Sequence, residues 1–334
     1  MKYDIITIGS ATRDIFFQSK AIQEKELEGY ATKRGACFPF ESKLDIDVFL
    51  EETGGGAVNT AVTFAYQGLK TAVLASVGDD EAGRRIEREL QEVGVSPEFL
   101  YQNKQKHTAT SIVISVGKGG RAIFRHKGAA GSLQNSQISW NKLKAKWFYI
   151  NHLRDEDALI VGEAVRRANE QGIKVAMNPG STQLERKEEL KGMLDGIDVF
   201  ILNQEEAAFI TDIPFEEKDR IFERLDDWVK GIVVMTRGPK GVEVSDGKIR
   251  WSAGILPMED IADRTGAGDA FGSGFVASLM KTPDDIEAAM QLGSANATGA
   301  LREWGAKNGL LKKTDSPLKW GALQIERKQL TAAV

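Results

Sequence analysis

The chain has 334 residues, enough for two average domains or for one large α/β domain with an appendage. Hydrophobic residues make up 42% and charged residues 28% of the sequence, a composition typical of a globular protein that buries a large core. The net charge is −4, and Lys and Arg are scattered along the chain, which argues against a nucleic-acid partner.

Two features bear on the compartment in which the protein works. Cys37 is the single cysteine, so no disulfide can form within the chain, and a reducing compartment suits it. The apolar run near the N-terminus is only a few residues long, too short for a signal peptide, and no uncharged stretch approaches the ~18 apolar residues of a membrane span. We therefore expect a cytoplasmic protein without a membrane partner.

Short apolar runs and amphipathic stretches alternate along most of the chain. Buried strands are expected at residues 3–9, 72–78, 147–150, 175–177, 199–202 and 232–236. Helices are expected at 57–68, 81–93 and 158–169. This alternation implies βαβ crossovers and so predicts an α/β protein: a three-layer α/β/α sandwich with a mainly parallel sheet, whose ligands bind at the carboxyl ends of the strands.

Two segments interrupt the alternation. Residues 16–53 are polar and charged and lack helical periodicity. Residues 108–126 have the pattern of a hairpin with a glycine-rich turn at 117–120. We expect these two segments to form a small β-lid over the crevice and to offer an interface to a second copy; the alternative is a pair of long surface excursions. The α/β core then comprises residues 1–15, 54–107 and 127–330.

The strongest local signal is the run Asp263-Arg264-Thr265-Gly266-Ala267-Gly268-Asp269, which an apolar helical stretch follows. The backbone N–H groups of Gly266, Ala267 and Gly268 would lie at a helix N-terminus and form an anion hole. An acid beside an anion hole suits phosphoryl transfer. The carboxylate of Asp269 accepts the proton of an attacking hydroxyl, while the N–H groups stabilise charge on the moving phosphoryl group. A helix N-cap is the structural alternative for Asp269.

Other familiar site patterns are missing. The glycine spacing does not fit a dinucleotide fingerprint, and the Walker A pattern of P-loop enzymes is absent. The histidines His107, His126 and His152 have no metal-ligand spacing, and no Gly-x-Ser-x-Gly elbow accompanies them. A P-loop enzyme and a hydrolase triad are therefore both disfavoured.

At these residues the sequence resembles a known family. Residues 263–274 resemble the C-terminal signature of the ribokinase-like (PfkB) carbohydrate kinases, and residues 54–59 followed by 78–83 resemble their N-terminal signature. Both signatures stand in the right order and separation, and the resemblance extends from the first strand to about Leu311. It implies an ATP-dependent kinase that uses Mg²⁺ and phosphorylates a hydroxyl group of a sugar or related polyol.

The resemblance also implies residues that hold the acceptor. Gly54, Gly55 and Gly56 would let a sugar lie against bare backbone, and Asn59 offers both a donor and an acceptor to its hydroxyls. Asp14 resembles the acid that grips two acceptor hydroxyls, with a turn-capping aspartate as the alternative.

Metal sites follow from the same resemblance. Asn203 and Glu206 resemble an Asn-x-x-Glu motif that orders the Mg²⁺–phosphate shell through water. A helix N-cap with a first-turn acid explains the pair equally well. Asp263 and Thr265 resemble a monovalent-cation site, for K⁺, that some relatives have.

The resemblance also implies several residues that bind the nucleotide. Thr236, Gly238 and Gly241 match a loop that approaches the ATP phosphates and ribose, and this loop is a β-turn in any case. Asn178 stands where the family places a residue near the phosphate path. Asn296 is expected on the helix that borders the adenine pocket, with a solvent-facing mid-helix position as the alternative.

One departure from the family pattern and two functional alternatives stay open. Arg264 stands where relatives often have a small hydroxyl residue; it either points outward or adds positive charge near an anionic acceptor. The acceptor is alternatively a nucleoside, with Phe38 or Phe40 as a platform for its base. The other alternative is a catalytically silent sugar-binding regulator, which the retention of Asp269, the glycine loop and Glu206 disfavours.

Overall fold

The computed structural model describes residues 2–28, 33–116, 120–154, 159–258 and 260–330. Its body is a ten-stranded sheet within these residues, in the order β7-β6-β1-β10-β11-β12-β13-β14-β15-β16. Neighbours from β7 to β13 run parallel, and neighbours from β13 to β16 run antiparallel. The strands are β1 (Tyr3–Ile8), β6 (Thr71–Gly78), β7 (Ser96–Asn103), β10 (Ala145–Ile150), β11 (Lys174–Met177), β12 (Val199–Asn203), β13 (Ile232–Thr236), β14 (Val242–Ser245), β15 (Ile249–Ala253) and β16 (Ile325–Gln329).

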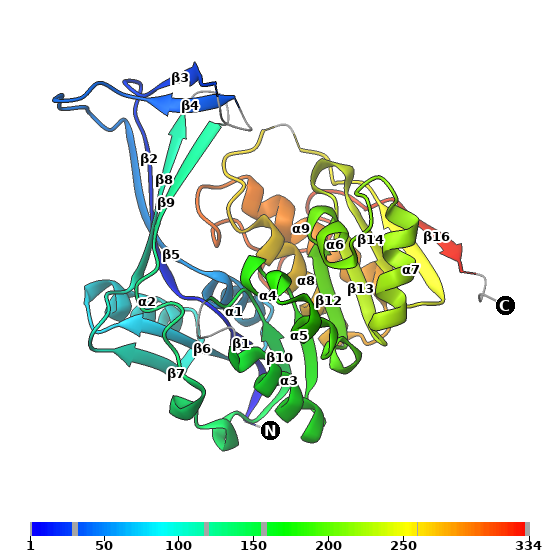
Figure 1. Cartoon of the computed structure of the whole chain (residues 1–334). Helices are drawn as coiled ribbons and strands as arrows, with labels where there is room; N and C mark the ends of the chain where they lie inside the picture. The colour runs from blue at the N-terminus through cyan, green and yellow to red at the C-terminus, as the bar shows by residue number, and fades with distance from the viewer. Residues whose placement is uncertain (1, 29–32, 117–119, 155–158, 259, 331–334) are drawn as a thin grey trace.

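Helices cover both faces of this sheet (Figure 1). Successive residues of a central strand enter opposite layers, because side chains alternate along a strand. Ile6 and Phe200 pack in a core cluster with residues of α3, α6 and α7, whereas Ile5 and Ile201 pack in a cluster with residues of α8 and α9. The helices are α1 (Gly56–Tyr66), α2 (Glu81–Glu92), α3 (Ile160–Glu170), α4 (Ser181–Glu185), α5 (Lys187–Lys191), α6 (Gln204–Thr211), α7 (Lys218–Trp228), α8 (Ala267–Lys281) and α9 (Ile286–Leu301). The predicted three-layer sandwich is confirmed.

A second sheet stands away from the body, as Figure 1 shows. Its order is β5-β2-β8-β9, and we call it the lid sheet. Strands β2 and β8 pair in parallel, while β5 and β9 pair antiparallel to them at the two edges. A hairpin of β3 (Gln23–Glu26) and β4 (Arg34–Cys37) lies at its far end. The lid strands are β2 (Thr12–Gln18), β5 (Val48–Gly54), β8 (Ala109–Val116) and β9 (Gly120–His126).

The boundaries differ from the expected ones in a few places. Asp14, which the sequence placed in the core segment, lies within β2 of the lid sheet, because the chain turns into a new strand at Thr12. The helix expected from residue 158 begins at Ile160 in α3, and residue 158 lies outside the described residues. Most of the expected 117–120 turn also falls outside them. Within the described residues, no helix is long and apolar enough to cross a bilayer.

Candidate active site

Asp269 lies in the first turn of α8, facing helix α1. The side-chain Nδ2 of Asn59 donates a hydrogen bond to Oδ2 of Asp269 over 2.9 Å, although 210 residues separate the two in sequence. Burial raises the pKa of Asp269 to about 6; the Asn59 hydrogen bond opposes the rise and the charge of Asp14 adds to it. A carboxylate with a pKa in this range is an effective proton acceptor near neutral pH.

The expected acceptor residues gather around Asp14. Its side chain is buried, and burial raises its pKa, while hydrogen bonds from Thr12 and Ser111 oppose the rise. A Cβ atom at Gly54 would collide with the Asp14 carboxylate, so glycine is needed where β5 passes this acid. Gly55 has a φ of +93°, and a Cβ there would meet the carbonyl of Ser10.

Gly56 begins α1 against Asn151, which follows β10. A Cβ at Gly56 would lie 2.9 Å from Cβ of Asn151. Asn151 is buried, and its Nδ2 donates to Oγ1 of Thr60 over 2.9 Å. Its Oδ1 and the Oδ1 of Asn59 are buried without a hydrogen-bond partner in the described part of the protein. Two unpaired buried acceptors at one edge of the crevice are what a ligand with hydroxyl groups can satisfy.

The glycine loop before α8 has the geometry of an anion hole. Gly266 is the N-cap with a φ of +75°, in the left-handed region. A Cβ at Gly268 would have no atom within 4 Å, so the backbone here faces open space. The first N–H groups of α8 have no partners within the helix, and its macrodipole favours an anion at this point.

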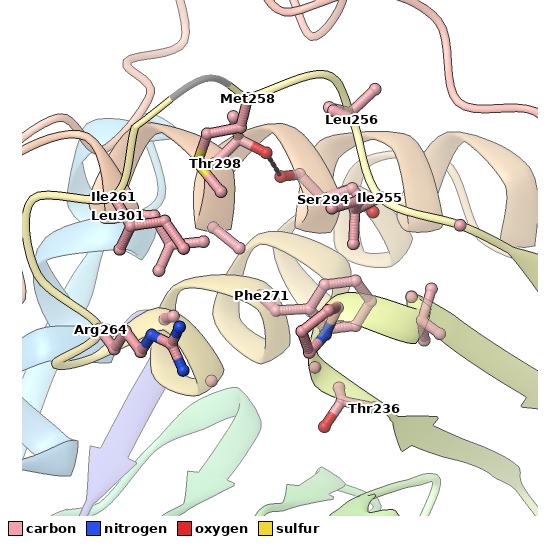
Figure 2. Close-up of a pocket in the computed structure, with 18 residues that line it drawn as sticks. Thr236, Ile255, Leu256, Met258, Ile261, Arg264, Phe271, Ser294, Thr298 and Leu301 are labelled. Atoms are coloured by element: carbon pink, nitrogen blue, oxygen red, sulfur yellow. Dashed lines mark hydrogen bonds between the residues drawn. The ribbon is translucent and has the colours of Figure 1, made fainter. Parts of the chain in front are cut away.

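An apolar cavity of about 320 Å³ lies beside this loop. Figure 2 shows Met258 and Ile261 at one wall of the cavity and Thr236 at the opposite wall, with Phe271 between the two walls. The expected residues Thr236, Gly238 and Gly241 all line it, together with Ala267 and Gly268 of the loop. The remaining lining residues are Pro239, Val242, Gly254, Ile255, Leu256, Arg264, Ser294, Ala297, Thr298 and Leu301. Flat apolar walls of this kind suit a nucleobase and its ribose.

Arg264 is the single charged residue among those that line this cavity. It lies at one end, next to the first turn of α8 (Figure 2). Within the described residues its guanidinium has no ion pair or hydrogen bond. The sequence left two alternatives for Arg264: that it points outward, or that it adds positive charge near an anionic acceptor. Neither fits fully, because Arg264 adds positive charge to the apolar cavity and not to the acceptor residues around Asp14.

Asn203 and Glu206 form a capping box at the start of α6. Oδ1 of Asn203 accepts from the backbone N–H of Glu206 over 2.8 Å, and Oε2 of Glu206 accepts from the N–H of Asn203 over 2.9 Å. Burial raises the pKa of Glu206, an effect that the nearby Glu205 strengthens. The helix-cap alternative is therefore realised, and one oxygen of Glu206 remains for a water of a metal shell.

Asn178 follows β11 and bridges to the next strand. Its Nδ2 donates to the carbonyl of Ile201 over 2.9 Å, which holds the ends of β11 and β12 together. It is not among the residues that line the apolar cavity.

Asn296 lies on α9, the helix that borders the apolar cavity, but its own side chain is not among the residues that line it. Its side chain is fully buried, donates to the carbonyl of Ala270 and to Thr63, and accepts from the N–H of Leu311 over 2.9 Å. The amide therefore joins α9 to α8, α1 and the segment after α9, and faces away from the cavity. Its neighbours Ser294, Ala297 and Thr298 form the helical wall instead, because they lie on the other face of α9.

Asp263 and Thr265 lie together, but their contacts are those of a closed turn. Oδ1 of Asp263 accepts from the N–H and the hydroxyl of Thr265, and Oδ2 accepts from the N–H of Gly305 over 3.3 Å. Arg121 of the lid sheet lies 3.9 Å from the same carboxylate. A cation already stands beside this acid, so these residues do not fit a monovalent-cation site. In the part of the chain that the structure describes, no cluster of three or more acidic, His or Cys side chains suits a metal.

Several residues around the crevice and the apolar cavity were not predicted from the sequence. One wall of the apolar cavity is formed by residues after β15, in a segment whose sequence has no periodicity that distinguishes it from a loop: Gly254, Ile255, Leu256, Met258 and Ile261. Asn151 gave one usable signal, because a polar residue directly after a buried strand lies at the carboxyl edge of a parallel sheet. Arg121 gave none, since its contact with Thr265 joins parts of the chain 144 residues apart.

Solved structures share this architecture. The ribokinase of Arabidopsis thaliana complexed with ribose and ATP matches with a TM-score of 0.75 and 21% identity, over 96% of this chain and 99% of that chain. The nucleoside kinase of Methanocaldococcus jannaschii, of the ribokinase family, matches with a TM-score of 0.72 and 22% identity, over 92% and 95%. Together these matches show a ribokinase-like fold.

Fold and site define a class of enzyme, a phosphotransferase with a hydroxyl group as acceptor. The model of the pfkB family carbohydrate kinases matches residues 24–313, and the chain belongs to this family. The cytidine kinase of Thermococcus kodakarensis is 28% identical over 255 residues, which are 75% of this chain and 88% of the relative. The ATP-dependent ribose-1-phosphate kinase of Halopiger xanaduensis is 29% identical over 251 residues, 74% of this chain and 79% of the relative.

Proposed function

We propose that the chain transfers the γ-phosphate of ATP to a hydroxyl group of a sugar or related polyol, with Asp269 as the general base. The acceptor oxygen forms a bond to the γ-phosphorus, the bond from that phosphorus to the bridging oxygen breaks, and ADP leaves with the electron pair. The acceptor proton passes to Asp269. The observation that carries this proposal is a half-buried carboxylate of raised pKa in the first turn of α8, which accepts a hydrogen bond from Asn59 and lies beside the exposed backbone of Gly268.

Asp14, Asn59 and the glycines 54–56 hold the acceptor. The carboxylate of Asp14 accepts from acceptor hydroxyls, and the buried Oδ1 of Asn59, which lacks a protein partner, accepts from another. Glycine at positions 54 and 55 lets this backbone pack closely against Asp14 and Ser10, which places the acceptor-binding carboxylate at the end of β5. Asn59 also touches Asp269, so the same amide positions the base and the group that it deprotonates.

The nucleotide lies in the apolar cavity with its phosphates toward the loop of Gly266, Ala267 and Gly268. Thr236, Gly238 and Gly241 lie along its ribose and phosphates, and Arg264 contacts a phosphate group. This orientation is supported by the position of the single lining cation at the α8 end of the cavity (Figure 2). Guanidinium groups bind phosphate strongly because their N–H groups match its oxygens.

Mg²⁺ would be held through water by Glu206, with Asn203 ordering that carboxylate and Asn178 near the phosphate path. The donor set fits the ion, because Mg²⁺ keeps several waters and needs few protein ligands. When bound it neutralises charge on the phosphates. The capping box fixes the orientation of Glu206 toward this task.

A single substitution tests the base. Asp269→Asn removes the proton acceptor and keeps the shape, so the turnover number should fall by roughly 10²- to 10⁴-fold while ATP binding is retained. The measurement is ADP release from Mg-ATP across a panel of sugars, sugar phosphates, sugar acids and nucleosides, with ATP binding followed by calorimetry. Asp195→Asn, at an exposed acid paired with Lys230, is the matched control. Turnover at the wild-type rate in Asp269→Asn would refute the mechanism.

A nucleoside is the second candidate acceptor, and the cytidine kinase relative favours it. The aromatic platform that the sequence suggested gives it no support: Phe38 and Phe40 are 52% and 93% exposed in the connection after β4, at the far end of the lid sheet. A neutral or charged sugar therefore remains the first choice. The panel above separates the two classes directly.

We infer that the protein forms a homodimer through the outer face of the lid sheet. Phe49, Ile112 and Phe124 lie on that face and are 60%, 36% and 59% exposed. Large apolar side chains in one surface patch are typical of protein interfaces. We expect the protein to act in the cytoplasm, where its ATP is available and the thiol of Cys37 stays reduced.

A further inference from the structure

The lid sheet turns one face toward the 263–269 loop, and strand register determines which residues that face carries. Asp14 pairs with Ser111 of β8, and Ser111 pairs with Arg125 of β9. Directly paired residues lie on the same face of a sheet, so Asp14 and Arg125 share a row. Gln18, Ser115 and Arg121 form another row of the same face.

Two contacts show that this face of the lid sheet is turned toward the crevice. Nη1 of Arg121 lies 3.4 Å from the hydroxyl oxygen of Thr265. At the other edge, Glu52 pairs with Asp14 and accepts a hydrogen bond from Asn308 over 3.1 Å. Thr265 precedes the glycine loop and Asn308 follows α9, so both edges of this face are held against the C-terminal half of the body.

The charge on this face is not balanced. Within the described residues, Arg125 has no ion pair or hydrogen bond, and its side chain is exposed. Arg121 stands 3.9 Å from Asp263, whose carboxylate already accepts from Thr265 and Gly305. Two guanidinium groups thus lie on the crevice side of β9. Arg121 is paired with Asp263, whereas Arg125 has no acid within ion-pair distance among the described residues.

The spacing between Asp14 and Arg125 suits a small ligand. Two inter-strand steps of about 4.8 Å separate their Cα atoms by ~10 Å, and both side chains project from the same face. A monosaccharide whose hydroxyls bind Asp14 would extend toward Arg125 with its far substituent. Ser111, between the two, adds a hydroxyl and no charge.

We propose that the acceptor carries an oxyanion, a phosphate or a carboxylate, which binds the guanidinium of Arg125. This inference rests on the proposed function, since it names the class of sugar that the same site takes. Arginine binds phosphate and carboxylate through paired N–H groups, and an unpaired arginine above a sugar site has no comparable role toward a neutral ligand. Two acids, Asp14 and Glu52, belong to the same row of paired residues as Arg125. They lie on β2 and β5, which are separated from β9 by β8.

The experiment compares matched acceptors: ribose with ribose 5-phosphate, fructose with fructose 6-phosphate, and glucose with gluconate. We expect wild-type protein to have the higher kcat/KM for an anionic member, and Arg125→Ala to reduce the anionic-to-neutral ratio of kcat/KM by about 10-fold or more. Arg125→Lys should recover part of that ratio. Arg84→Ala, which removes the same charge from the exposed face of α2, is the control and should keep the wild-type ratio.

A second readout needs no turnover. The same anionic sugars, added without nucleotide, should raise the melting temperature of wild-type protein and of Asp269→Asn, but much less that of Arg125→Ala. Comparison of the sugar phosphates with gluconate shows whether the bound group is a phosphate or a carboxylate. An anionic-to-neutral ratio unchanged by Arg125→Ala, or a preference for the neutral sugars, would overturn this inference while Asp269-dependent transfer keeps the proposed function. Full activity of Asp269→Asn would overturn the proposed function, and the melting shifts would still decide whether Arg125 binds an anion.

Discussion

Asn59 serves two groups at once, and this double role determines the acidity of the base. Its Nδ2 donates to Asp269, while its Oδ1 is left for a ligand. The hydrogen bond stabilises the ionised carboxylate and so opposes the burial that raises the pKa of Asp269 to about 6. The amide therefore holds the pKa of the base below the value that burial alone would give, and so favours the ionised form at neutral pH.

The pH profile of Asn59→Leu tests this role. Because the folded state raises the pKa of Asp269 from 3.8 to about 6, it binds the proton more tightly than the unfolded chain does. This carboxyl thus favours folding most below pH 3.8, and its contribution is lost as the pH rises through 6. In wild type, kcat/KM should fall as the pH drops below about 6. In Asn59→Leu, the pKa of Asp269 should be higher, so this acidic limb should move to higher pH, in addition to any loss of acceptor affinity.

The measurement is kcat/KM for one acceptor between pH 5 and 9. Gln105→Leu, at an exposed amide outside the crevice, is the control. An acidic limb at the wild-type pH in Asn59→Leu would show that the hydrogen bond does not tune the base.

Single residues also show where sequence reasoning stops. The position of Asp269 in the first turn of a helix after a glycine loop could be predicted from the local sequence, whereas the role of Asp14 was predicted only through the family resemblance. The direction of the Asn296 side chain could not be predicted, because a mid-helix asparagine looks the same whether it faces a ligand or joins three segments of the core. Only the packing of α9 decides between these positions.

At the scale of elements, the buried strands and the amphipathic helix α2 could be predicted because their patterns record burial directly. Strand β16 could not, since four of its five residues are exposed and it pairs only at the sheet edge. The lid sheet and its β8–β9 hairpin were predicted, but the pairing of β2 with β8 was not, because it joins residues about a hundred positions apart in the chain. Pairing between distant segments leaves no local signal.

The base of the lid sheet is anchored by Lys307, which follows α9. Its side chain is 11% exposed, and its Nζ donates to Thr53 of β5 and to Glu89 of α2. Burial lowers the pKa of Lys307, while the charges of Glu89 and Glu52 oppose this effect. Arg85 binds Glu89 as well, so one acid holds two cations against the end of β5.

Lys307→Met should therefore destabilise the protein. Removing one partner of a largely buried pair leaves Glu89 and Thr53 less well satisfied, and we expect a loss of roughly 1–3 kcal/mol in the free energy of unfolding. The melting temperature, from thermal unfolding at neutral pH, should fall by several degrees. Lys146→Met is the matched control, because Lys146 pairs with Asp4 at a mostly exposed site worth about 0–1 kcal/mol. Equal melting temperatures for the two variants would mean that Lys307 is no anchor.

At the scale of the whole molecule, the lid sheet has two faces of different chemistry. The crevice face carries Asp14 and the two arginines of β9, whereas the outer face carries Phe49, Ile112 and Phe124. Since residues alternate between faces along each strand, one sheet serves the site and offers an apolar surface at the same time. A second copy that covered this surface would also hold the crevice face in place.

Phe124→Glu tests whether the outer face is a dimer interface. A buried charge in an apolar interface costs several kcal/mol, enough to dissociate a dimer of moderate affinity. We expect the mass in solution, measured by light scattering over a dilution series, to be that of a dimer in wild type and of a monomer in Phe124→Glu. Phe209→Glu, at a phenylalanine 49% exposed on α6, makes the same change away from the lid sheet and should leave the dimer intact. A dimer that survives Phe124→Glu would mean that the interface lies elsewhere. A wild-type monomer at all concentrations would mean that the protein does not dimerise. If the dimer dissociates, the acceptor KM of Phe124→Glu then reports how far the second copy orders the crevice face.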